Sequence, residues 1–250
     1  MVPLDKFASA FKDFADDYVI IGGTALAEIS RKNNLVPRAT KDLDLIVLAS
    51  LKRGDFMRRL IAFAQEAGYE EMTRSSDFCS YRLSDPKDRS FPAAIELFCF
   101  DQALGQNLSV HLAHLAVSDE VSFSAIMLEP HYREFIEAHV QKETISYLDE
   151  EAMIPLKAKA YLGNRSLYRQ KAPGISLEKV RKHGRDIIRL STLLDNAHPC
   201  FLSQPIYQDL FAAIALMKTD GFDVTQIGDY PFFDFFADQV NVHYRLATKS

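Results

Sequence analysis

The sequence has no apolar stretch of the roughly 18 to 20 residues that a membrane-spanning helix needs. Residues Met1 to Lys12 also show no basic region followed by an apolar block, which is the pattern of a secretory leader. From these two absences we expect a soluble, cytoplasmic protein with no membrane partner. Internal repeats and low-complexity segments are absent as well. The 250 residues are enough for one large domain or two small ones.

Cysteine is scarce, and its pattern excludes the common uses of the thiol. Cys79, Cys99 and Cys200 are odd in number, have no CxxC spacing and stand mostly among apolar or aromatic neighbours. We therefore expect reduced thiols in the core rather than disulfides or a zinc site.

The chain has no excess of positive charge. A net charge of -5 argues against nonspecific binding of a polyanion over the whole surface, because such binding needs many cations facing phosphates. Basic residues nevertheless gather in one region, either as a solvated helical face or as a local polyanion site. They are Lys157, Lys159, Arg165, Arg169, Lys171, Lys179, Arg181, Lys182, Arg185 and Arg189.

The N-terminal part alternates between helical spacing of apolar residues and short β-favouring runs. This pattern predicts helices at 4–17, 24–31 and 55–67, and strands at 18–21, 43–48, 78–83, 93–100 and 121–128. After about Tyr147 the spacing becomes helical, at 153–162, 177–194 and 206–217, with no comparable strand between these segments. We therefore predict an α+β protein with a mixed sheet and flanking helices in residues 1–146 and a helical part in residues 147–250.

The segment after Asn196 carries a dense aromatic run. Aromatic side chains can stack on nucleic-acid bases, but a run this dense favours packing between helices. The residues are Tyr230, Phe232, Phe233, Phe235 and Phe236.

Three residues at the end of the first predicted strand suit an anion. Gly22, Gly23 and Thr24 separate the strand from a helix, and glycine lets the chain come close to a ligand. The backbone amides at the start of the helix then face a phosphate at the positive end of the helix dipole. Alone, such a turn is a weak signal.

Two carboxylates open the second predicted strand. Asp42 and Asp44 are two residues apart, so both lie on one face while Leu43 and Leu45 lie on the other. Such like charges repel unless a cation neutralises them, and Mg²⁺ prefers carboxylate and phosphate oxygens. The alternative is a solvated strand end.

A third carboxylate, Glu96, stands alone within the apolar run from Ala93 to Phe100. An isolated acid there needs a partner or an edge position that faces water. If this strand lies beside the one with Asp42 and Asp44, the three carboxylates converge, and two metal ions can bridge the oxygens of an in-line displacement.

In these features the chain resembles the nucleotidyltransferase superfamily related to DNA polymerase β. More narrowly, it resembles the AbiEii type, the toxin half of bacterial toxin–antitoxin or phage-abortive systems. The resemblance covers roughly residues 15 to 195. The matching residues are Gly22, Gly23, Thr24, Arg38, Thr40, Asp42, Asp44, Glu96, Lys157, Ala160, Arg165, Lys182, His183 and Asp186. Two of them depart from the pattern, because His183 stands where an aspartate is usual in this type and Glu96 where an aspartate is commoner in the superfamily.

The resemblance implies two Mg²⁺ ions held by Asp42, Asp44 and Glu96. It also implies that a nucleoside triphosphate is bound by Gly22, Gly23, Thr24, Arg38, Thr40, Lys157 and Lys182. Asp186 would orient Lys157 or Lys182, or act as the base toward the acceptor hydroxyl. The implied acceptor is RNA, particularly a tRNA end, and the implied partner is a cognate antitoxin.

Three other interpretations stay open at this point. The acceptor can be a protein hydroxyl, modified by nucleotidylation or phosphorylation. The chain can be a non-catalytic binding protein that kept the fold, although three acids and Lys157 argue against it. It can also resemble the antibiotic-modifying members of the superfamily, whose small cationic acceptors would prefer an acidic cleft.

Overall fold

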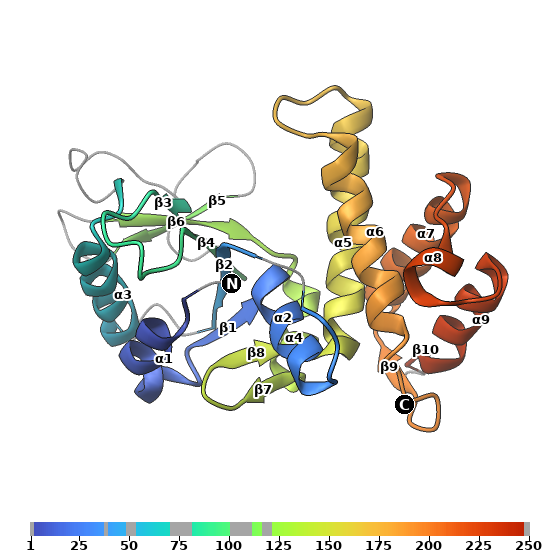
Figure 1. The fold of residues 1–250 in the computed structure, drawn as a ribbon, viewed down its shortest axis with the longest axis horizontal. Coiled ribbons are helices and arrows are strands. Elements are labelled where there is room, and N and C mark those ends of the chain that lie inside the picture. The colour runs from blue at the N-terminus through green and yellow to red at the C-terminus, as the bar shows by residue number, and fades with distance from the viewer. Residues whose placement is uncertain are drawn as a thin grey trace. The chain divides into compact units, whose positions relative to one another are not determined.

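The computed structural model describes residues 3–37, 40–48, 54–70, 82–100, 112–116 and 122–247. They form two compact units, an N-terminal unit of Met1–Asp149 and a C-terminal unit of Glu150–Ser250. The first contains a mixed sheet with flanking helices, and the second is mainly helical (Figure 1). The α+β class predicted from the sequence is confirmed. The units divide after β8 (Ser146–Leu148), which belongs to the sheet, so the sheet extends beyond residue 146.

The described residues of the N-terminal unit contribute eight strands to one sheet. The strand order is β5-β6-β4-β2-β1-β8-β7, and β3 pairs with β4 beside this path. The central strand β2 runs antiparallel to β1 and parallel to β4. The strands are β1 (Tyr18–Ile21), β2 (Asp42–Val47), β3 (Arg82–Ser84), β4 (Ala94–Cys99), β5 (Leu112–Ala116), β6 (Ser122–Met127), β7 (Val140–Lys142) and β8.

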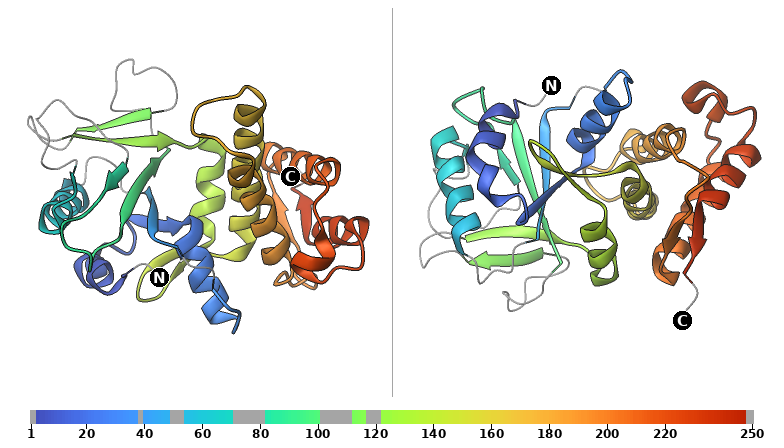
Figure 2. Two further views of the ribbon diagram at one scale, coloured as in Figure 1. Left: turned by 45° about the horizontal axis from the view of Figure 1, so that its top comes forward. Right: turned by 90° about the horizontal axis from the view of Figure 1, so that it is seen from below.

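Helices cover both faces of this sheet. An aromatic cluster fills the face that bears Tyr18, where Phe7 and Phe11 of α1 (Asp5–Phe11) lie 5.2 and 6.2 Å from the Tyr18 ring centre. Phe56 of α3 (Gly54–Ala67) stacks on the same ring at 6.1 Å. The opposite face is covered by α2 (Gly22–Lys32), which packs on β1 and β2 (Figure 2). Because the faces alternate along each strand, β2 directs Leu43 and Leu45 into the aromatic side.

Several elements differ from the sequence prediction. The helix expected over 4–17 ends at Phe11 and continues as a 3₁₀ turn, η1 (Lys12–Phe14). Of the strand expected at 78–83, residues 78–81 lie outside the described residues. Strands β5, β7 and β8 and the short helices η3 (Pro130–Tyr132) and α4 (Arg133–Ala138) were not predicted. Elements of three to six residues are too short to show a clear hydrophobic period.

The C-terminal unit is built on two long helices, α5 (Glu150–Arg169) and α6 (Leu177–Ser191), which pack against each other. The Ser176 hydroxyl caps α6 by accepting a hydrogen bond from the backbone N–H of Lys179 at 3.2 Å. The remaining helices are α7 (Gln204–Thr219), α8 (Val224–Gly228) and α9 (Phe233–His243). The sequence showed no comparable strand between the expected helices, but the three-residue strand β9 (Cys200–Leu202) lies between α6 and α7 and pairs in parallel with β10 (Tyr244–Leu246).

The aromatic run is divided between core and surface. Tyr230 and Phe236 are buried, as helix packing requires, whereas Phe232 and Phe235 are 58% and 40% exposed. Cys99 and Cys200 are buried thiols outside any disulfide, as expected, and Cys79 lies outside the described residues. No helix in the described part of the chain is both long enough and apolar enough to cross a membrane.

Candidate metal and nucleotide site

The structure brings together the three carboxylates that the sequence singled out. Parallel pairing of β2 with β4 sets Asp44 directly opposite Glu96, and Asp42 opposite Ala94. Asp42 shares the face of Asp44 because it stands two residues earlier on the same strand. All three acids are half-buried, whereas Ile95 and Leu97 on the other face of β4 are fully buried. The three acids therefore lie side by side on one face of two neighbouring strands.

The glycine turn lies against this group of acids. Register pairs Ile21, the last residue of β1, with Asp44, so α2 begins beside the carboxylate. Gly22 has φ +69°, and a Cβ atom on it would stand 1.8 Å from Oδ2 of Asp44. Only glycine fits here, because any side chain would meet both the backbone strain and the carboxylate. The start of the helix also places its positive dipole end near this negative charge.

The other two residues of the turn, Gly23 and Thr24, contact the start of β2 and the residues before it. Thr24 is buried and donates its hydroxyl to the backbone carbonyl of Asp42 at 2.9 Å. The Thr40 hydroxyl donates to the same carbonyl at 3.5 Å. A Cβ atom on Gly23 would stand 2.6 Å from Oγ1 of Thr40, so the turn and the residues before β2 are in close contact. Arg38, also expected at this site, lies outside the described residues.

An arginine that sequence reasoning missed lies among the acids. Arg82 on β3 pairs in register with Glu96 on β4, and its Nη1 forms an ion pair with Oε1 of Glu96. Its Nη2 lies 3.4 Å from Oδ2 of Asp42. Burial of the guanidinium would lower the pKa of Arg82, but the charges of Glu96 and Asp42 outweigh this and raise it. Arg82 therefore places a permanent positive charge between two of the predicted metal ligands.

The three acids are not preassembled as a coordination sphere. Among the described residues, ligand atoms of Asp42, Asp44 and Glu96 are not all within 4.8 Å of one another. The guanidinium of Arg82 bridges two of them instead. Side-chain rearrangement must accompany any binding of a cation by all three.

In the C-terminal unit, the predicted residues Lys157 and Asp186 form a buried ion pair. Lys157 Nζ of α5 lies 3.0 Å from Asp186 Oδ2 of α6, and their side chains are 7% and 0% exposed. The structure thus brings these two residues together across the helix pair. Lys182 is exposed on α6, and His183 Nε2 lies 2.9 Å from Asn164 Nδ2.

No family model and no curated protein matches this chain. Function is therefore inferred from the arrangement of its side chains.

Several basic side chains of α5 and α6 form ion pairs or hydrogen bonds within the protein. Arg165 is buried and binds both carboxylate oxygens of Asp220 at 2.7 Å, so its guanidinium has a structural partner. Lys159 pairs with Asp209, and Arg181 donates to the carbonyl of Asp220. The cations whose side chains are exposed to solvent are Arg169, Lys171, Lys179, Lys182 and Arg189.

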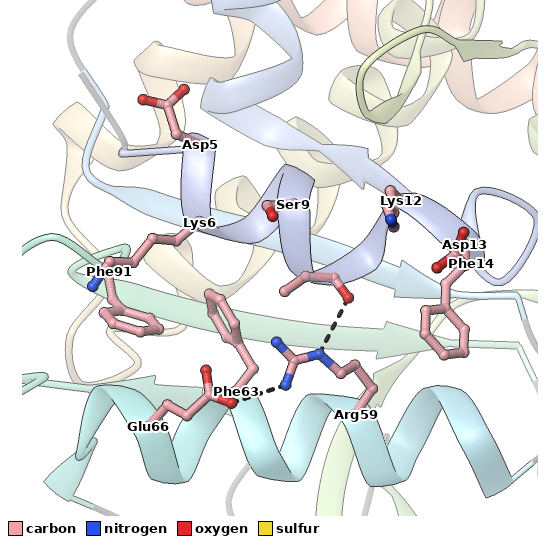
Figure 3. A pocket seen from close by; sticks show the side chains of 11 residues that line it. Asp5, Lys6, Ser9, Lys12, Asp13, Phe14, Arg59, Phe63, Glu66 and Phe91 are labelled. Carbon is pink, nitrogen blue, oxygen red and sulfur yellow. Dashed lines mark hydrogen bonds and ion pairs between the residues drawn. The ribbon is translucent and has the colours of Figure 1, made fainter.

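A groove of about 710 Å³ lies between α1 and α3 (Figure 3). These helices cover the face of the sheet that bears Tyr18, opposite the face of the acids. Arg59 crosses it, donating to the Ala10 carbonyl at 3.1 Å and to Glu66 at 3.0 Å. Lys6 lies over the Phe91 ring and pairs with Asp88 at 2.7 Å. None of the residues predicted to be functional lines this groove. The contacts of Arg59 and Lys6 connect α1 to α3 and to the loop before β4.

Proposed function

We propose that the chain is a magnesium-dependent nucleotidyltransferase that moves a nucleotide from a nucleoside triphosphate to a macromolecular hydroxyl. One observation carries the proposal. Asp44 lies opposite Glu96, with Asp42 on the same face, and this acidic face adjoins the glycine start of α2. A carboxylate group beside the amide end of a helix combines sites for a cation and for the anion that the cation accompanies.

The donor set fits magnesium chemically. Asp42, Asp44 and Glu96 would hold the metal, since Mg²⁺ prefers carboxylate oxygens together with substrate phosphates. When bound, divalent cations offset the charge that develops on phosphate oxygens during transfer. Backbone N–H groups in the first turn of α2 would donate hydrogen bonds to the phosphates. The N-cap residue of this helix, Ile21, makes no side-chain capping bond. Gly22 and Gly23 let the phosphates approach that backbone.

Lys157 is proposed to neutralise phosphate charge, with Asp186 as a positioning residue. The 3.0 Å contact between Lys157 Nζ and Asp186 Oδ2 favours an orienting role for Asp186. Asp186 would hold the Lys157 ammonium in its position on α5.

The preferred acceptor is RNA, particularly a tRNA end. Exposed cations of α5, α6 and the connection between them would contact the phosphate backbone of such a polyanion. They are fewer than the sequence suggested, because Arg165, Lys159 and Arg181 have internal partners. A protein hydroxyl is the alternative acceptor, and a cognate antitoxin is the proposed protein partner.

A second function, that of a non-catalytic binding protein with this fold, is favoured by one observation. Arg82 bridges Asp42 and Glu96, which gives these acids a partner that needs no metal. In that case the acidic face would be a structural ion-pair cluster rather than a reaction centre.

One labelling experiment distinguishes the two functions. The purified protein is incubated with Mg²⁺, each α-labelled nucleoside triphosphate and either total RNA or cell lysate. A nucleotidyltransferase labels one macromolecule, and the double variant Asp42→Asn/Asp44→Asn, which keeps the side-chain volumes, does not. Absence of labelling by the folded wild-type protein with every nucleotide and acceptor would favour the binding protein, and undiminished labelling by the double variant would refute the site.

A further inference from the structure

The proposed reaction gives no role to Arg82, which lies among the three acids. It comes from β3, a third strand beside the two that carry the acids, and register places it directly opposite Glu96. Its two terminal nitrogens contact different partners, Nη1 with Glu96 and Nη2 with Asp42. The guanidinium therefore bridges carboxylates on two different strands, β4 and β2.

The charges explain why such a bridge forms. Asp42, Asp44 and Glu96 share one face of adjacent strands, and their like charges repel one another in the absence of a cation. A guanidinium stays protonated under all ordinary conditions and presents a planar fork of donors that suits two carboxylates. Arg82 is 40% exposed, so its side chain has a route out of the cluster toward solvent.

A divalent cation and this guanidinium compete for the same oxygens. Mg²⁺ or Mn²⁺ bound by Asp42 and Glu96 would stand a few ångströms from the Arg82 charge, and two cations at that distance repel strongly outside bulk water. The carboxylates that Arg82 bridges are also not gathered around one point with Asp44. Metal binding thus requires both departure of the guanidinium and convergence of the acids.

We propose that Arg82 is a built-in counter-cation that occupies Asp42 and Glu96 in the metal-free protein and must leave before a divalent cation binds. It thereby stabilises the metal-free fold and lowers the affinity of the site for metal. This inference rests on the proposed function, because it assumes that the three carboxylates are metal ligands. Arg82 is a positioning residue here, acting through the carboxylates that it holds.

The test compares Mn²⁺ binding by the full-length wild-type protein and Arg82→Gln, followed by electron paramagnetic resonance of free Mn²⁺. The matched control is Arg58→Gln, which makes the same charge change on α3, where Arg58 is exposed and paired with Asp55. Removing the competitor should tighten Mn²⁺ binding roughly three- to tenfold, the size expected from loss of two partly exposed ion pairs. Arg58→Gln should bind like the wild type.

Thermal unfolding adds a readout that is independent of catalysis. In the presence of a metal chelator, the melting temperature of Arg82→Gln should be lower than that of the wild type, because the three acids lose their counter-cation. Saturating Mn²⁺ should raise the melting temperature of Arg82→Gln more than that of the wild type, since tighter binding stabilises the folded state more. If Arg82→Gln does not fold, Arg82→Lys replaces it. The single ammonium of lysine bridges two carboxylates less well than the guanidinium fork, so Mn²⁺ binding should tighten by a smaller factor than in Arg82→Gln.

The outcomes separate this inference from the function on which it rests. Equal or weaker Mn²⁺ binding by Arg82→Gln, with clear binding by the wild type, overturns the counter-cation role and leaves the metal site standing. Absence of Mn²⁺ binding by both proteins overturns the metal site, and the inference with it. Tighter binding by Arg58→Gln equal to that of Arg82→Gln shows a general charge effect and also overturns the inference.

Discussion

The carboxylate of Asp44 lies where a side chain on Gly22 would begin, with only 1.8 Å between its Oδ2 and an ideal Cβ at that glycine. This contact joins the end of β1, the start of α2 and the acidic face of β2 in one small volume. The glycine is required here by two independent conditions, a left-handed backbone and the approach of a charged group.

Gly22→Ala should therefore lower the free energy of unfolding more than the same substitution at another glycine with a left-handed backbone conformation. We expect a loss of about 2–4 kcal/mol in the free energy of unfolding, from roughly 1 kcal/mol of backbone strain plus displacement of Asp44. Mn²⁺ affinity should fall with it. Chemical denaturation and Mn²⁺ titration measure both effects.

Gly174→Ala is the control, because Gly174 has φ +76° and nothing within 4 Å of an added Cβ. It should cost only about 1 kcal/mol and leave Mn²⁺ binding unchanged. Equal losses in the two variants would show that the approach of Asp44 has no energetic consequence.

The buried pair of Lys157 and Asp186 should be strongly coupled. Removing one partner by Lys157→Met or Asp186→Leu leaves a buried group without its counter-charge and should cost about 3–5 kcal/mol. The double variant Lys157→Met/Asp186→Leu should cost much less than the sum, because it leaves no buried charge. A denaturation double-mutant cycle measures the coupling, and additive losses would contradict it.

The same double variant separates stability from function. If Lys157 contributes only an internal ion pair, nucleotide transfer should survive in the folded double variant. The proposed phosphate contact predicts instead that transfer is lost while the protein stays folded. The labelling assay described above gives the answer.

Asp220 should make the stability of the C-terminal unit depend on acid pH. Hydrogen bonds from Arg165, and more weakly from Tyr161, lower the pKa of Asp220 against partial burial, which raises it. A lowered folded pKa stabilises the protein above the unfolded value of about 3.9, and the stabilisation is lost as pH falls through the folded pKa. Asp220→Asn should thus cost about 3 kcal/mol at pH 7 and progressively less below about pH 4.

Urea unfolding at pH 7, 4 and 3 measures this dependence. Asp234→Asn is the control, since Asp234 forms an exposed pair with Lys218 and should cost at most about 1 kcal/mol at any pH. A difference between wild type and Asp220→Asn that stays constant down to pH 3 would contradict a lowered pKa of Asp220 in the folded protein.

Local patterns in the sequence predicted those parts of the fold that depend on neighbouring residues. The continuous apolar run of β1 and the alternation of Asp42, Leu43, Asp44 and Leu45 gave the strand and its two faces correctly. The period of two also placed Asp42 and Asp44 together. These features need no knowledge of distant parts of the chain.

Parts that depend on register between distant segments were harder to predict. That Glu96 faces Asp44 was an open condition in the sequence, because it depends on how β2 and β4 slide past each other. The position of Arg82 needs a second register, between β3 and β4, and a lone arginine in a polar strand gave no signal for it. Strands β9 and β10 have three residues each, which is too short for a period to appear.

The central claim is that Asp42, Asp44 and Glu96 bind divalent cations, and anomalous diffraction tests it most directly. Crystals of the wild-type protein would be grown with Mn²⁺ and a non-hydrolysable nucleoside triphosphate, and data collected near the manganese absorption edge. We predict anomalous density in contact with all three carboxylates, with the triphosphate at the start of α2 and Arg82 turned away from Asp42 and Glu96. Crystals that show no manganese at these carboxylates, with Arg82 still bridging Asp42 and Glu96, would contradict the claim.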